Sequence, residues 1–123
     1  MTFCTSIHCM DGRIQEPIIQ YLKKNYNVSF VDSITEPGPN KIVAEYLNQQ
    51  TMESIKNRAD ISIQKHGSTL LAMSGHHDCA GNPTNEATQK RQIKKSINYL
   101  QGQYPNVEII GLWIDKNWTV CPV

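Results

Sequence analysis

The sequence alternates short apolar runs with longer segments of helical periodicity, and this alternation constrains the fold more than any other feature. The apolar runs, each expected to form a strand, are residues 2–9, 28–34, 68–74 and 107–114. The helical segments between them are residues 16–27, 40–47, 51–66 and 85–103, with Asn40, Thr51 and either Thr84 or Asn85 as the expected start residues and Gly67 as a left-handed stop. Strands separated by helices form parallel sheets. We therefore expect an α/β fold with a central parallel sheet, helices on both faces, and a last short strand, "WTVCPV", that folds back antiparallel.

Length and charge narrow the class of protein. A chain of 123 residues predicts a single domain, residues 1–123. Its 12 basic and 11 acidic residues leave a net charge of +1, which gives no reason to expect nucleic acid or an anionic membrane as a partner. The start "MTFCTSIHCM" does not resemble a signal peptide, and no run approaches the roughly 20 apolar residues that span a bilayer. We expect a cytoplasmic protein, where cysteines are more often metal ligands or catalytic groups than disulfides.

A cluster of histidine and cysteine follows the third expected strand. In "GHHDC", His76 and Cys79 have the spacing H-x-x-C, which lets both side chains reach one ion from a tight turn. If the first and third strands are neighbours, Cys9 at the end of the first faces the same crevice. Two thiolates and one imidazole suit zinc, and three protein ligands leave a fourth position open for chemistry. The alternatives are that these residues are buried core side chains, or that Cys9 and Cys79 form a disulfide.

Charged residues follow Cys9 directly. In "CMDGR", Asp11 and Arg13 alternate with Cys9, so all three are expected near one side of the chain. A carboxylate beside an open metal position can accept a hydrogen bond there or occupy the position itself, and a paired arginine keeps it ionised. The simpler interpretation is a turn aspartate with a surface arginine.

These motifs resemble those of the β-class carbonic anhydrases. "CMDGR" matches the family's C-x-D-x-R signature, "GHHDCAG" is similar to its G-H-x-x-C-G signature, and "GLWIDKNWTV" resembles its last strand, acidic turn and return strand. The resemblance implies a sheet in the order 2-1-3-4 extended by an antiparallel strand. It implies one Zn²⁺ per chain held by Cys9, His76 and Cys79, with Asp11 and Arg13 as the catalytic pair, and a homodimer or higher homo-oligomer.

The implied reaction is the reversible hydration of carbon dioxide to bicarbonate and a proton, in which zinc lowers the pKa of bound water towards about 7. The chain departs from the family pattern in its short length, in Gly12 and in Ala80, and Gln15 is no motif match. Two alternatives keep the metal: a zinc hydrolase of carbonyl sulfide or carbon disulfide, and a zinc-binding module without catalysis, with Asp11 as fourth ligand. Among the flanking residues, His8 or His77 could relay protons and Asp78 could accept a hydrogen bond from a ligand.

Overall fold

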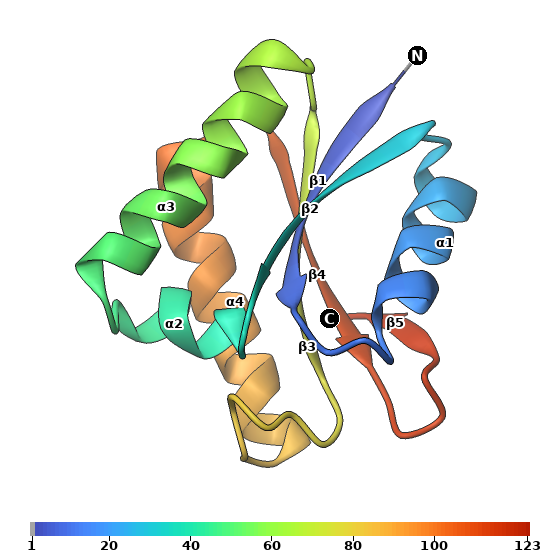
Figure 1. The fold of residues 1–123 in the computed structure, drawn as a ribbon, viewed down its shortest axis with the longest axis vertical. Helices are drawn as coiled ribbons and strands as arrows, with labels where there is room; N and C mark the ends of the chain where they lie inside the picture. The colour runs from blue at the N-terminus through green and yellow to red at the C-terminus, as the bar shows by residue number, and fades with distance from the viewer. Residues whose placement is uncertain (1) are drawn as a thin grey trace.

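The computed structural model describes residues 2–123, which form a five-stranded mixed sheet in the order β2-β1-β3-β4-β5 (Figure 1). The parallel strands are β1 (Phe3–Cys9), β2 (Phe30–Glu36), β3 (Leu70–His76) and β4 (Glu108–Ile114). Strand β5 (Val120–Pro122) runs antiparallel to β4. The expected fold class, strand order and antiparallel last strand are confirmed.

Helices cover both faces of the sheet. Helix α1 (Gln15–Tyr26) lies on one face, and α2 (Pro39–Glu45), α3 (Gln49–Asp60) and α4 (Glu86–Gln103) lie on the other (Figure 1). Successive strand residues serve opposite faces: Leu70 belongs to the core under α1, whereas Leu71 belongs to the core under α2–α4. All seven residues of β3 are buried, as expected of a central parallel strand covered on both sides.

Helix α2 begins differently from the prediction. Its N-cap is Gly38, in the left-handed region at φ 64°, and Pro39 occupies the first helical position, where no N–H is needed. Asn40, the expected cap, is instead buried, and its side-chain amide donates to Gln89 and Gln92 of α4. The backbone geometry of the "PGPN" segment therefore sets the start of α2, and the side chain of Asn40 binds α4 instead of capping its own helix.

The other helix ends follow side-chain capping. Helix α3 starts after Asn48, whose side chain accepts a hydrogen bond from the Thr51 N–H, so Thr51 lies within the helix instead of starting it. A π-helical turn (Ile61–Lys65) continues α3, and Gly67 follows at φ 72° as expected. Asn85 caps α4 by accepting from the Thr88 N–H, which decides between the two predicted start residues.

The loops after β1 and β3 lie at the same edge of the sheet, because these strands are parallel neighbours (Figure 1). Among residues 2–123, no helix combines the length and apolar character needed to cross a bilayer.

Candidate metal centre

Cys9 and His76 are the last residues of the two central strands. Cys9 ends β1 and His76 ends β3, and both side chains are buried. The condition set by the sequence, that the first and third strands be neighbours, is met. The pairing of the two strands thus brings together two residues that are 67 positions apart in the sequence.

A tight turn brings Cys79 back to the same point. The backbone of this turn, residues 76–79, is held by the His77 N–H, which donates to Ile114 O of β4 at 2.9 Å. The chain reverses direction at Asp78, which adopts φ 58°. Aspartate tolerates this left-handed conformation better than most residues do. Cys79 is consequently buried against the end of β1.

The three predicted ligands converge. One donor atom from each of Cys9, His76 and Cys79 lies within 4.8 Å of the other two. The two sulfur atoms are 3.8 Å apart. Tetrahedral zinc with Zn–S distances of about 2.3 Å places two sulfurs about 3.8 Å apart. The spacing of the thiols therefore fits one shared metal ion, and all cysteines in the described chain, Cys9 and Cys79 included, are free.

The imidazole of His76 is oriented for metal binding. Its Nδ1 lies 2.7 Å from His77 O, and because a carbonyl oxygen only accepts, Nδ1 carries the proton. Nε2 then bears the lone pair, is buried, and has no hydrogen-bond partner. A buried nitrogen without a partner is costly, and a metal ion between the thiols would satisfy it.

The protonation of the two thiols is coupled. The hydrogen bond between them lowers the pKa of Cys9 and raises the pKa of Cys79. Thiols bind metal as thiolates, so metal binding at this pair is expected to depend on pH.

Asp11 and Arg13 form the predicted pair at the mouth of this cluster. Arg13 Nη2 donates to Asp11 Oδ2 at 2.7 Å and its Nε to Oδ1 at 3.0 Å. The hydrogen bonds from the Arg13 side chain lower the pKa of Asp11 to about 2. Asp11 Oδ2 lies 4.0 Å from His76 Nε2, so the carboxylate borders the candidate metal position.

Arg13 has two further partners that the sequence did not reveal. Its guanidinium donates to the Asp78 carboxylate at 3.2 Å and to Asp78 O at 3.1 Å, and it lies 4.7 Å from the ring centre of Trp118. The expectation that Asp78 accepts from a ligand is wrong, since His77 O takes that role and Asp78 binds Arg13 instead. Arg13 thus joins the loop after β1 to the loop after β3, through Asp78, and to the β4–β5 turn, through Trp118.

Gln15 and His8 stabilise the end of β1. The Gln15 amide donates to Cys9 O and Asp11 O at 2.9 and 2.7 Å, and its oxygen lies 2.8 Å from His8 Nε2. His8 is fully buried and its Nδ1 contacts Ser6, so both ring nitrogens are engaged, whereas His77 is exposed; a proton relay by either stays a prediction. Gln15 therefore has a backbone-holding role that no motif marks.

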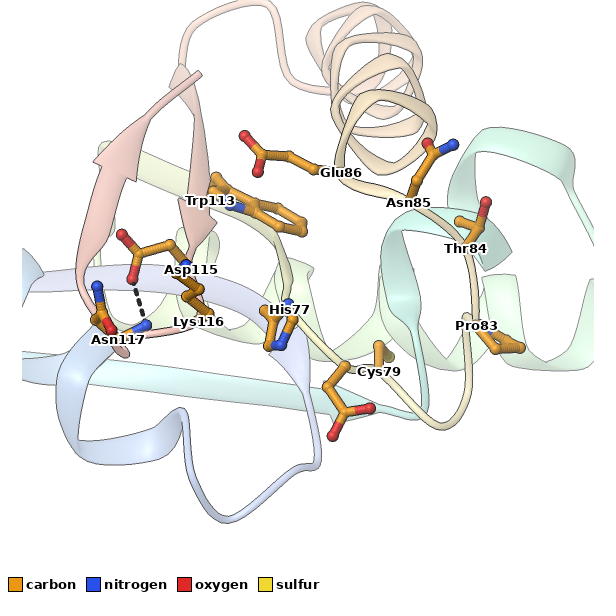
Figure 2. Close-up of a pocket in the computed structure, with 11 residues that line it drawn as sticks. His77, Cys79, Pro83, Thr84, Asn85, Glu86, Trp113, Asp115, Lys116 and Asn117 are labelled. Carbon is orange, nitrogen blue, oxygen red and sulfur yellow. Dashed lines mark hydrogen bonds between the residues drawn. The ribbon is translucent and has the colours of Figure 1, made fainter.

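An open cavity of about 690 Å³ lies next to Cys79 (Figure 2). Its wall includes His77 and Cys79 from the ligand turn, Glu86 at the start of α4, and Trp113 and Lys116 from the β4 side. Acidic and basic side chains both line it, so its charge does not select one ligand class.

Comparison with known proteins gives a family match over the whole chain. A family model described as "Putative carbonic anhydrase" matches residues 1–123. Among curated protein sequences, none matches this chain.

Solved structures share the fold at low identity. The carbonic anhydrase of Streptococcus mutans has a TM-score of 0.64 and 16% identity, covering 97% of this chain and 80% of that one. One of two tetrameric β-carbonic anhydrases of Sordaria macrospora has a TM-score of 0.61 and 12% identity, covering 98% and 79%. The carbonic anhydrase of Glaciozyma antarctica has a TM-score of 0.62 and 15% identity, covering 96% and 80%. At such identities the likeness shows the fold alone.

Proposed function

The chain belongs to the carbonic anhydrase family, and on that premise we propose that it is a β-class-like zinc enzyme for the reversible hydration of carbon dioxide to bicarbonate. The convergence of Cys9, His76 and Cys79 is the observation that carries this proposal. Two sulfurs at tetrahedral spacing and a buried imidazole nitrogen without a partner form a donor set suited to Zn²⁺. We assign these three side chains as the ligands of one Zn²⁺ per chain.

Zinc would supply the acidity that makes water a nucleophile near neutral pH, by lowering the pKa of a bound water to about 7. The residues of the chain supply orientation. Asp11, held ionised by Arg13, would accept a hydrogen bond from the attacking oxygen and direct its lone pair towards the carbon of carbon dioxide. Arg13 in turn is held by Asp78, so the carboxylate of Asp11 keeps one orientation.

The proposal extends to the protein as a whole. We take residues 1–123 as a single zinc domain that acts in the cytoplasm as a homodimer or higher homo-oligomer on a small substrate, with no nucleic-acid or membrane partner. The near-neutral charge and the absence of a candidate membrane-spanning helix among residues 2–123 support the choice of partner. Oligomers are described for the Sordaria macrospora relatives, which supports the choice of assembly.

A zinc-binding module without catalysis is the second candidate. Asp11 Oδ2 lies 4.0 Å from His76 Nε2, near enough for a small shift to make Asp11 a fourth ligand. In that state the open position is filled and Arg13 keeps only its contacts with Asp78 and Trp118.

Stopped-flow hydration of carbon dioxide by the zinc-loaded protein tests the proposal. We expect a rate well above the uncatalysed one, and Asp11→Asn should retain zinc but lose about 10- to 100-fold in turnover. The reason is that one hydrogen bond to a charged group is worth about 1.5–3 kcal/mol.

Two outcomes discriminate between the candidate functions, and a third tests the role of Asp11. Zinc-loaded protein without hydration activity supports the binding module, and hydrolysis of carbonyl sulfide or carbon disulfide in place of carbon dioxide hydration supports the related hydrolase. Turnover unchanged in Asp11→Asn removes Asp11 from the mechanism.

A further inference from the structure

Gln89 is a polar side chain where the helix–sheet interface is otherwise apolar. It lies in the first turns of α4, is 1% exposed, and faces β3 near Ile93, which is fully buried in the core. A glutamine is seldom buried so completely unless both ends of its amide are hydrogen-bonded. Its partners therefore show what it is for.

The amide of Gln89 binds the backbone of His76. Its Nε2 donates to His76 O at 2.9 Å, and its Oε1 accepts from the His76 N–H at 3.3 Å. The register between β1 and β3 ends at the pair Ile7–Met73, before His76 is reached. His76 is still in register with Ile114 of β4, and beyond the end of the β1 pairing Gln89 adds two hydrogen bonds to its backbone.

The contact continues to the second ligand of the turn. Asn40 of α2 donates to Gln89 Oε1 at 3.2 Å and to Gln92 Oε1 at 3.3 Å, and Asn82 donates to Gln92 Oε1 at 2.7 Å. The Asn82 N–H donates to Cys79 O at 3.2 Å. One continuous set of side-chain amides therefore connects the main chain at His76 with the main chain at Cys79.

Gly75 leaves the space that this arrangement fills. A Cβ built on Gly75 would lie 2.6 Å from Gln89 Oε1 and 2.8 Å from Asn40 Nδ2. The amides are thus packed against the backbone one residue before His76, and only glycine permits that approach.

From these contacts we propose that Gln89 is a positioning residue for the metal centre, which acts through the main chain of His76 and, with Asn40, Gln92 and Asn82, fixes the turn from His76 to Cys79. This inference rests on the zinc site of the proposed function. It assigns the preorganisation of two of the three ligands to side chains outside both sequence motifs. Partners that orient metal ligands commonly contribute 10- to 100-fold in metal affinity.

The test is Gln89→Met, which keeps the length of the side chain and removes both hydrogen bonds. Zn²⁺ affinity is measured by competition with a chromophoric chelator, and site geometry by the visible absorption of the Co²⁺-substituted protein. We expect Zn²⁺ affinity to fall by about tenfold or more and the Co²⁺ bands to shift or broaden, because His76 no longer has a fixed orientation.

Ser62→Ala is the matched control. This variant also removes a buried side-chain hydrogen bond, the one between Ser62 Oγ and Thr5 Oγ1, which are 2.6 Å apart. Ser62 lies in the π-helical turn and not at the metal centre. We expect it to lower the melting temperature while leaving Zn²⁺ affinity and the Co²⁺ spectrum as in the wild type.

A second variant covers the case in which Gln89→Met does not fold. Gln89→Leu also lacks both hydrogen-bonding groups and fills the site with a different apolar shape, so we expect the same loss of Zn²⁺ affinity. Wild-type Zn²⁺ affinity and Co²⁺ spectrum in either folded variant would overturn the proposal. These readouts use metal alone, so a failure here is distinct from a failure to hydrate carbon dioxide.

Discussion

At the scale of the residue, the surroundings of two buried cysteines in the same strand give them different chemistry. Burial raises the pKa of Cys4 to about 11, which makes it an inert core side chain, whereas the hydrogen bond with Cys79 lowers the pKa of Cys9. The sequence singled out Cys9 and Cys79 because Cys9 ends the first strand and Cys79 lies in the turn after the third, whereas Cys4 lies inside the first strand. It did not predict the partners of Arg13, since contact between Asp78, Trp118 and Arg13 depends on how three loops meet.

Loss of one sulfur ligand should release the metal. In Cys79→Ser we expect less than one Zn²⁺ per chain, a lower melting temperature, and no further decrease when a chelator is added, because zinc affinity is partly folding free energy. Metal analysis and thermal unfolding with and without chelator measure this.

Cys121→Ser is the control for that experiment, since Cys121 lies in β5 and outside the cluster. It should keep its zinc and its response to the chelator. A Cys79→Ser protein with one tightly bound Zn²⁺ per chain would refute the ligand assignment.

At the scale of the element, apolar runs predicted the strands and helical periodicity predicted the helices. Neither pattern predicted how the loops pack on one another. The start of α2 was mispredicted because Asn40 follows a Gly-Pro pair that sets the helix start by backbone geometry. The amide chain from Asn40 to Gln89 joins residues 49 positions apart, and no local pattern marks such a contact. Sequence periodicity therefore does not predict the side chains that hold the site in place. It does predict the ligands, because they lie at or just after the ends of strands.

The loop after Cys79 packs closely on the loop before α2. A Cβ on Gly81 would lie 2.6 Å from the backbone carbon of Pro37. We therefore expect Gly81→Ala to lower the free energy of unfolding by about 1–3 kcal/mol, the usual cost of overpacking, and to weaken zinc binding, because the ligand turn must shift. Chemical denaturation and chelator competition measure the two effects.

Gly12→Ala serves as the comparison, since apart from its two chain neighbours no residue has an atom within 4 Å of a Cβ built there. It should leave both quantities within experimental error of the wild type. Equal behaviour of the two variants would show that the loop contact does not support the site.

At the scale of the whole molecule, the sheet topology creates the site. Adjacent parallel strands deliver their carboxyl ends to one edge, and β1 and β3 are such neighbours (Figure 1). The fold is shared with carbonic anhydrases that are only 12–16% identical, so topology is retained while most side chains differ. In our proposal the motif residues are the part of the sequence that gives this fold its chemistry.

X-ray absorption at the zinc edge of the purified, zinc-loaded protein tests the central claim most directly, since it reports the atoms bound to the metal. We predict two sulfur neighbours at about 2.3 Å and one imidazole nitrogen at about 2.0–2.1 Å, with one further light atom completing four-coordination. A zinc ion without sulfur neighbours, or with more than two, would contradict the assignment of Cys9, His76 and Cys79.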